Sequence, residues 1–187
     1  MNTFTQIMNG QKVLPIIQAQ SIEQGLLTAD IMQAKGYRVV EVVLRSDISA
    51  ELITQIKQAF PDMVVGAGTI VDANSLSSAL SAGADFIITP TTTPYLLELL
   101  GKVDVPVIPG VSNMSDVLAC IEQGYTELKL FPAVLSGGVA MLKTINSVFP
   151  QLRFCPTGGI SQNNMNDFLE LENVTAVGGT WLAKVSA

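Results

Sequence analysis

The segment AKGYRVVEVVL, residues 34–44, contains the pattern from which the fold can be predicted. A helix-like stretch ends before Gly36, the glycine stands where a left-handed residue follows a helix, and an apolar run begins at once. The same order of helix, glycine and strand recurs in SAGADFIIT (81–89) and in EQGYTELKL (122–130). Runs that are apolar along their whole length are typical of strands covered on both faces, as in a parallel sheet.

Short apolar runs alternate with helix-like stretches along the whole chain at near-uniform spacing, which favours a (β/α)8 TIM barrel. No GxGxxG follows the first strand, and this disfavours a doubly wound dinucleotide-binding sheet. The predicted strands are Val13–Ile17, Val39–Leu44, Met63–Gly66, Phe86–Ile88, Val105–Ile108, Glu127–Phe131, Arg153–Pro156 and Val174–Val177. The predicted helices include Ile22–Ala34, Ala50–Phe60, Asn74–Ala82, Met114–Glu122, Ala140–Phe149 and Asn163–Leu171.

A length of 187 residues predicts a single barrel domain that spans residues 1–187. The sequence ends shortly after the eighth predicted strand, so we expect the C-terminal outer helix to be missing. No apolar stretch reaches the roughly 18 residues of a transmembrane helix, and residues 1–11 lack the regions of a signal peptide. We therefore expect a cytoplasmic protein without a membrane partner.

The charge balance and the missing histidines exclude several classes of function. With 10 Lys and Arg against 16 Asp and Glu, the net charge is −6, and no basic run predicts a nucleic-acid partner. The chain holds no histidine, which excludes Ser-His-Asp and Cys-His nucleophiles and nearly every catalytic zinc geometry. The two cysteines, Cys120 and Cys155, form no CxxC and are expected to be reduced and buried. An enzyme built from this sequence must use Lys, Glu, Asp, Arg, Thr or Tyr.

Lys129 is the most informative residue because it stands in the apolar run ELKLF (127–131). Burial disfavours the charged ammonium, and a neutral amine is the nucleophile that Schiff-base chemistry requires. Glu41 stands in the apolar run VVEVV (39–43), so it is either an acid inside the barrel or the partner of a buried cation. Together, Glu41 and Lys129 form a candidate pair of general base and nucleophile. Structural roles are the alternatives. Lys129 could lie on an edge strand and point outward, or it could pair with Glu127. Glu41 could form a structural ion pair with Arg45.

Other candidate residues lie where the predicted strands end, which is the catalytic face of such a barrel. Arg45 shares a strand face with Glu41 and could clamp a carboxylate, or it could be a solvated charge. Gly158–Gly159 and Gly178–Gly179 are predicted in loops after the last two strands, where exposed backbone N–H groups commonly bind phosphate. Glycine pairs also form ordinary turns.

At these positions the sequence resembles the 2-keto-3-deoxy-6-phosphogluconate aldolase family, the KDPG/KHG aldolases. The matching segments follow the family's order over nearly the whole chain and are specific when taken together. They are VVEVVLRSD (39–47), VVGAGTI (64–70), FIITP (86–90), VPVIPGVSNMSD (105–116), ELKLFPA (127–133), GGV (137–139), RFCPTGGIS (153–161) and VGGTWL (177–182).

The resemblance implies a (β/α)8 barrel, usually a homotrimer, with class I Schiff-base chemistry on a phosphorylated 2-keto acid and neither metal nor organic cofactor. It implies that Lys129 forms the Schiff base and that Glu41 is the general acid and base, acting through a water. The residues that it assigns to substrate binding are Arg45 and Thr69 at the pyruvyl carboxylate, Pro90, Pro109 and Phe131 at the pocket wall, and Thr157, Gly158, Gly159, Gly179 and Thr180 at the phosphate end.

Three departures from the family pattern concern the distal part of the substrate. The usual SPG after the fourth strand reads Thr89-Pro90-Thr91, the Glu after FPA is Val134, and the Ser after the last Gly-Gly is Thr180. Two other functions remain open. The first is a phosphate-binding isomerase or epimerase with Glu41 as base, and the second is a non-catalytic barrel that binds keto acids or sugar phosphates.

Overall fold

The computed structural model describes residues 3–183, which form an α/β fold of parallel strands and surrounding helices. Every strand pairing in this part of the chain is parallel. The strands are β1 Val13–Ile17, β2 Val39–Val43, β3 Val64–Gly68, β4 Phe86–Ile88, β5 Val107–Ile108, β6 Gly110–Val111, β7 Glu127–Leu130, β8 Arg153–Phe154 and β9 Val177–Gly179. The helices are α1 Phe4–Met8, α2 Ile22–Ala34, α3 Ser49–Ala59, α4 Ala73–Ser81, α5 Pro94–Leu100, α6 Met114–Glu122, α7 Gly138–Val148 and α8 Met165–Leu169.

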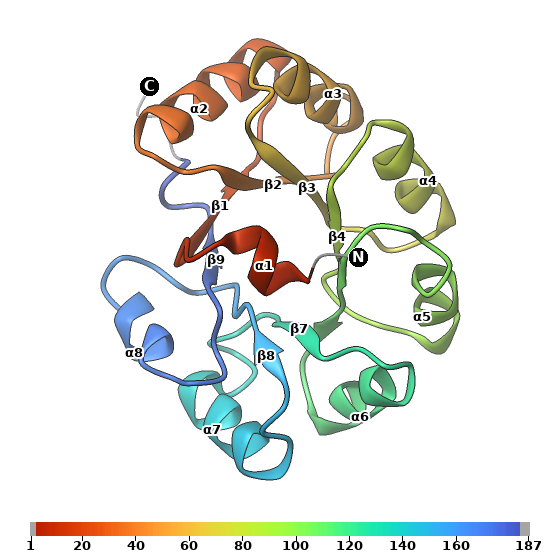
Figure 1. Ribbon diagram of the computed structural model, residues 1–187, viewed down its shortest axis with the longest axis vertical. Helices are drawn as coiled ribbons and strands as arrows, with labels where there is room; N and C mark the ends of the chain where they lie inside the picture. Colours follow the sequence, from red (N-terminus) through yellow and green to blue (C-terminus); the bar gives the residue numbers. More distant parts are fainter. Residues whose placement is uncertain (1–2, 184–187) are drawn as a thin grey trace.

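The strands form two sheets, in the orders β5-β4-β3-β2-β1-β9 and β6-β7-β8. The sheets curl around a common centre with the larger helices outside them (Figure 1). Pro109 separates β5 from β6 because it has no N–H to donate, although its carbonyl accepts from the Lys129 N–H. Isolated parallel bridges, Phe154 to Val174 and Thr157 to Gly178, link the chain around β8 with the chain around β9.

The three glycines that led to the fold prediction end their helices as expected. Gly36, Gly83 and Gly124 have φ angles of 88°, 81° and 83°, in the left-handed region. At the end of α2 the Gly36 N–H donates to Gln33 and the next N–H, of Tyr37, donates to Met32. The ends of α4 and α6 repeat these two bonds, which satisfy the last helix carbonyls and turn the chain toward the next strand.

Three sequence predictions need correction. The last strand is Val177–Gly179 rather than Val174–Val177, so Gly178 and Gly179 lie in a strand that pairs with β1 and not in a loop. Both glycines are required there, since a Cβ at Gly178 would meet the Thr157 side chain and one at Gly179 would meet the Trp181 ring. Helices α1 and α5 were not predicted, and the fifth strand is divided at Pro109.

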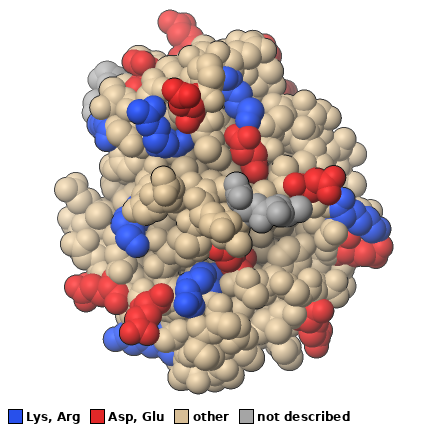
Figure 2. Space-filling view, in the orientation of Figure 1, with Lys and Arg blue, Asp and Glu red and all other residues tan. Residues whose placement is uncertain are grey.

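The apolar core has an outer shell and an interior. Two clusters pack strands against helices, and a third lies inside the curled sheets with residues from α1 and from several strands. Helix α1 crosses one end of the strands (Figure 1), where the Phe4 ring packs 5.8 Å from the Phe86 ring, between centroids. Glu127 fixes this helix by accepting hydrogen bonds from the N–H groups of Phe4 and Thr5. Charges of both signs are interspersed over this face (Figure 2).

The end of the chain leaves one prediction open. Residues 180–183 after β9 contain no helix, and residues 184–187 lie outside the described residues, so the expected lack of a C-terminal outer helix stays a prediction. Between residues 3 and 183, no helix combines the length and the apolar character needed to cross a membrane.

Candidate active site

Strand β7 directs Lys129 into the interior of the fold. Its neighbours Leu128 and Leu130 are fully buried in the outer cluster that packs against the helices. Because side chains alternate along a strand, Lys129 points the opposite way, and its side chain is only 6% exposed. The edge-strand alternative for Lys129 is therefore wrong, since β7 lies between β6 and β8.

Glu41 faces Lys129 from β2. Val40 and Val42 belong to the outer cluster, so Glu41 points inward, and its side chain is 0% exposed. The distance from Lys129 Nζ to Glu41 Oε1 is 3.4 Å. The second carboxylate oxygen, Oε2, is buried and has no hydrogen-bond partner in the described structure. A buried polar atom without a partner is unusual in a folded protein, and a catalytic role is one of the explanations for it.

Gly68 on β3 provides the space that the Glu41 carboxylate occupies. A Cβ at Gly68 would overlap Glu41 Oε1 and would lie 2.7 Å from its Cδ. Gly66, two residues earlier on the same strand, provides the space for the Phe86 ring. Strand β3 therefore carries glycine wherever the interior must accommodate a larger side chain from a neighbouring strand.

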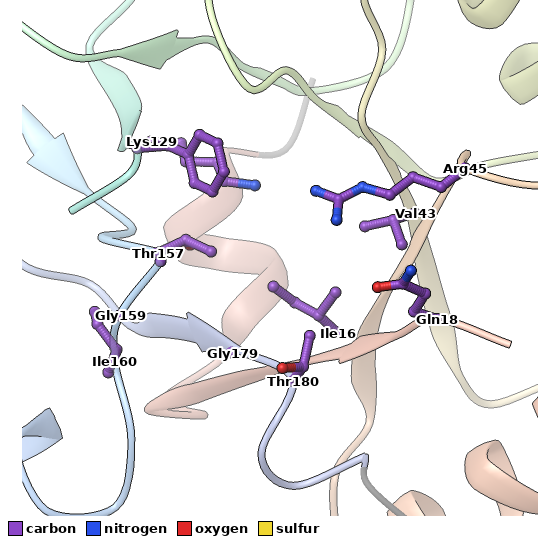
Figure 3. Close-up of a pocket in the computed structure, with 12 residues that line it drawn as sticks. Ile16, Gln18, Val43, Arg45, Lys129, Thr157, Gly159, Ile160, Gly179 and Thr180 are labelled. Carbon is purple, nitrogen blue, oxygen red and sulfur yellow. The ribbon is translucent and has the colours of Figure 1, made fainter. Parts of the chain in front are cut away.

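A pocket of about 180 Å³ opens beside Lys129. Figure 3 shows the Lys129 amine and the Arg45 guanidinium pointing toward one another across it, and Nζ lies 5.1 Å from the centre of the Phe131 ring. The residues that line the pocket are Ile16, Gln18, Val43, Arg45, Lys129, Phe131, Thr157, Gly158, Gly159, Ile160, Gly179 and Thr180.

Thr69 holds Arg45 in position. The Arg45 Nε donates to Thr69 Oγ1 at 3.2 Å, and Arg45 forms no salt bridge within residues 3–183. Thr69 has a φ of 62°, a left-handed conformation that costs a residue with a Cβ on the order of 1–2 kcal/mol. Strain of this kind often marks functional sites. It places the hydroxyl beside the guanidinium and leaves the terminal nitrogens of Arg45 available.

The Thr157-Gly158-Gly159 segment forms the opposite side of the pocket. Gly158 and Gly159 have φ angles of 96° and 77°. A Cβ at Gly158 would lie 3.1 Å from Pro132, so a larger residue there would be strained by the left-handed φ and crowded by Pro132. The N–H groups of Gly158, Gly159 and Ile160 donate to no acceptor in the part of the chain that the structure describes. Successive free N–H groups in a glycine turn are able to bind an anion.

Eight of the predicted site residues line this pocket, and four do not. Glu41 lies beneath it, Thr69 lies behind Arg45, and Pro90 packs its backbone against Gly110 on β6 instead of forming the wall. Pro109 is also absent from the lining. A Cβ at Gly110 would meet the carbonyl group of Pro90, which shows how closely these two segments approach.

Sequence reasoning missed four residues that line the pocket. They are Ile16, Gln18, Val43 and Ile160. Ile16 and Val43 follow from strand alternation, because each lies two residues from an inward-facing side chain on β1 or β2. Gln18 lies just beyond the end of β1, and its signal was a polar side chain at the carboxyl end of a parallel strand.

Cys155 lies in the interior cluster and does not serve as a nucleophile. Burial raises the pKa of its thiol to about 12, the Glu41 charge adds to this effect, and the Lys129 charge opposes it. The thiol is therefore neutral at physiological pH, whereas cysteine reacts as a thiolate. No cluster of three or more metal-ligating Cys, Asp or Glu side chains exists in residues 3–183.

Comparison with known proteins identifies the family. The model of the KDPG and KHG aldolases matches residues 4–187. The chain belongs to this family. A 2-dehydro-3-deoxy-phosphogluconate aldolase of Dickeya dadantii is 40% identical over 182 residues, which cover 97% of this chain and 85% of the relative. A KHG/KDPG aldolase of Escherichia coli K12 is 39% identical over 97% of this chain and 85% of its own.

A solved structure of a family member carries direct chemical information. The KDPG aldolase of Legionella pneumophila, with pyruvate captured as a covalent carbinolamine intermediate, superposes with a TM-score of 0.91 at 38% identity. The match covers 95% of this chain and 86% of that one. A carbinolamine is the adduct of an amine and a carbonyl, so that relative forms a covalent bond to pyruvate through an amine.

Proposed function

We propose that this chain is a class I aldolase that cleaves 2-keto-3-deoxy-6-phosphogluconate to pyruvate and glyceraldehyde 3-phosphate, or 4-hydroxy-2-oxoglutarate to pyruvate and glyoxylate. The observation that carries the proposal is the buried pair of Lys129 and Glu41, 3.4 Å apart, beside a pocket that also holds Arg45. Family membership and the covalent pyruvate adduct of the Legionella relative support the same chemistry.

Bond formation begins at Lys129. Transfer of its proton to Glu41 leaves a neutral amine, which attacks the C2 carbonyl carbon and gives a carbinolamine. Glu41 then returns the proton through a water to the carbinolamine hydroxyl, which leaves as water, and an iminium and a Glu41 carboxylate result. The positive charge of the iminium takes the place of the metal ion that other aldolases use to withdraw electrons. The negative charge of Glu41 stabilises this cation at short range in a site with little water.

Cleavage follows from the withdrawal of electrons. The C4 hydroxyl loses its proton through a water to Glu41, the C4–O bond becomes a carbonyl, and the C3–C4 electron pair moves into the iminium. The aldehyde departs and leaves the enamine of pyruvate. Glu41 returns this proton through the water to C3, which restores the iminium, and hydrolysis by water then releases pyruvate and leaves Lys129 as its ammonium. Glu41 is enclosed below the pocket, so a water must carry protons between its carboxylate and the substrate.

The remaining groups position an elongated substrate that has an anionic group at each end. Arg45, held by Thr69, binds the C1 carboxylate through its terminal nitrogens. The N–H groups of Gly158 and Gly159, with the hydroxyl of Thr180, bind the anionic group at the other end. Val134, where the family has Glu, touches Gly159 and makes the rim beside this end apolar, since a Cβ at Gly159 would lie 2.7 Å from its Cγ2.

The proposal includes the complete barrel and its assembly. We infer that the two sheets are one (β/α)8 barrel, with β5 and β6 as one strand interrupted at Pro109 and with the bridge from Thr157 to Gly178 closing the ring. We also infer a cytoplasmic homotrimer. Exposed apolar side chains support self-association: Leu135 is 86% exposed, and Val71, Tyr95 and Val134 are also exposed. Light scattering of the purified protein tests the trimer.

Reductive trapping tests the chemistry. Borohydride added with pyruvate should convert the iminium to a stable secondary amine, and peptide mass spectrometry should place the three-carbon adduct on Lys129. Lys129→Met serves as the matched control and should give no adduct. An adduct elsewhere, or none on the folded protein, would refute the Schiff-base mechanism. It would then favour a proton-transfer isomerase that uses Glu41 as base, or a barrel that only binds.

A further inference from the structure

Strand β1 directs the Gln18 side chain into the pocket. Leu14 belongs to the interior cluster, Ile16 lines the pocket, and Ile17 lies in the outer shell. The alternation therefore continues from Leu14 through Ile16 to Gln18, which lies one residue beyond the end of the strand and also lines the pocket. Gln18 itself is exposed in the loop that follows β1, and it lies on the inward side of this alternation.

The carboxamide of Gln18 is free of protein partners. Within residues 3–183 it makes no hydrogen bond, whereas the amide of Gln11 bonds to Val13 and Val39 and the amide oxygen of Gln24 accepts from Gln20. A carboxamide offers both a donor N–H and an acceptor oxygen. Both are therefore available to a ligand in the pocket.

Gln18 stands between the two ends of the binding site. Strand β1 pairs with β2, which leads to Arg45, and with β9, which leads to Thr180. Figure 3 shows the Gln18 side chain on the wall between these two residues. If Arg45 binds the carboxylate of the substrate and the glycine end binds its phosphate, Gln18 faces the carbon atoms between them.

We propose that Gln18 is a specificity-determining residue that binds the C5 hydroxyl of the six-carbon substrate. This inference rests on the proposed aldolase function. Lys129 engages C2 and the water of Glu41 engages the C4 hydroxyl, so the C5 hydroxyl is the polar group that still lacks a partner. A hydroxyl both donates and accepts, which matches a carboxamide. The five-carbon 4-hydroxy-2-oxoglutarate has a carboxylate carbon at C5 and no hydroxyl there.

The variant Gln18→Met tests this assignment because it keeps the length of the side chain and removes the carboxamide. We expect kcat/KM for 2-keto-3-deoxy-6-phosphogluconate to fall by about 3- to 10-fold, the effect of one neutral hydrogen bond. The value for 4-hydroxy-2-oxoglutarate should stay close to that of the unaltered protein. Gln20→Met is the matched control, because Gln20 is exposed on the same segment and does not line the pocket.

Two further measurements separate the C5 contact from other roles. Trapping of pyruvate by Gln18→Met should proceed at the unaltered rate, since pyruvate has no C5 hydroxyl, and a folding defect would slow it. The same fall in kcat/KM should occur with unphosphorylated 2-keto-3-deoxygluconate, which retains the C5 hydroxyl. Three outcomes would overturn the assignment. The first is an equal fall of kcat/KM on five- and six-carbon substrates, and the second is no fall on either. The third is a fall that occurs only with the phosphorylated substrate. Failure of the proposed function would instead show in the unaltered protein, as the absence of both cleavage and a pyruvate adduct.

Discussion

A methyl group added at Gly68 tests whether the position of Glu41 controls the rate. In Gly68→Ala the new Cβ would lie 2.7 Å from Glu41 Cδ. Carbon atoms in ordinary contact are about 3.5–4.0 Å apart, so the carboxyl group must retreat by roughly 1 Å. A displacement of about 1 Å in a reacting group can reduce turnover by about 100-fold. Steady-state release of pyruvate, measured with a coupled dehydrogenase, should show this loss in kcat.

Gly66→Ala is the matched control on the same strand. Its Cβ would crowd the Phe86 ring instead of the carboxylate. Overpacking of the interior should cost both variants about 1–3 kcal/mol of unfolding free energy, measurable in urea. Only Gly68→Ala should lose the large factor in kcat. A folded Gly68→Ala protein with nearly unaltered kcat, or equal kcat losses in the two variants, would refute the role given to the Glu41 carboxylate.

Three further predictions concern individual ionisable groups. Glu41→Gln should lower kcat by about 10²–10⁴-fold while the folded protein still forms the borohydride-trapped pyruvate adduct; full activity would contradict general acid–base catalysis by this residue. Hydrogen bonds from the Ser75 N–H and the Ser75 hydroxyl lower the pKa of Asp72 in the folded protein. Ionised Asp72 therefore stabilises the fold at pH values above its unfolded-state pKa. This stabilisation is lost as the pH falls through the folded-state pKa. Tm of Asp72→Asn should therefore decline less than that of the unaltered protein between about pH 6 and pH 3, and parallel Tm curves would contradict this. Burial raises the pKa of Cys120 and Cys155 to about 12, so at pH 8 maleimide should label neither thiol in the native protein and both in guanidinium, as read by mass spectrometry.

Regular elements were predictable where local rules determine them. The strand and helix boundaries around Gly36, Gly83 and Gly124 follow from backbone chemistry confined to a few residues. Helix α1 was missed because five residues carry too little periodicity, and the helix is held by Glu127 more than 120 residues away. Strand β9 was shifted because its glycines have no side chain to signal burial, although their close packing with Thr157 and Trp181 requires glycine.

The composition of the pocket was less predictable because it depends on depth along each strand. Val43 lines the pocket and Glu41 does not, although both point inward from β2. Two residues along a strand correspond to roughly 6.6 Å, which is enough to place Glu41 a layer lower. Lys129 reaches the pocket because its side chain is longer. The sequence identifies the face of the sheet on which each residue lies. The arrangement of the strands determines how far each side chain lies from the pocket along the strand direction.

The local charge of the pocket explains how an acidic protein can bind an anionic substrate. The chain carries a net charge of −6, yet the pocket region contains the cations Lys129 and Arg45 against the single carboxylate of Glu41. Arg45 forms no salt bridge in the described chain. Its side-chain hydrogen bond goes to the neutral hydroxyl of Thr69. An acidic partner for Arg45 would compete with the substrate carboxylate, whereas a hydroxyl orients the guanidinium without neutralising it. The low-dielectric walls of the pocket focus the electric field of the remaining positive charge. The substrate is therefore attracted locally at the pocket, although the net negative charge of the protein repels it.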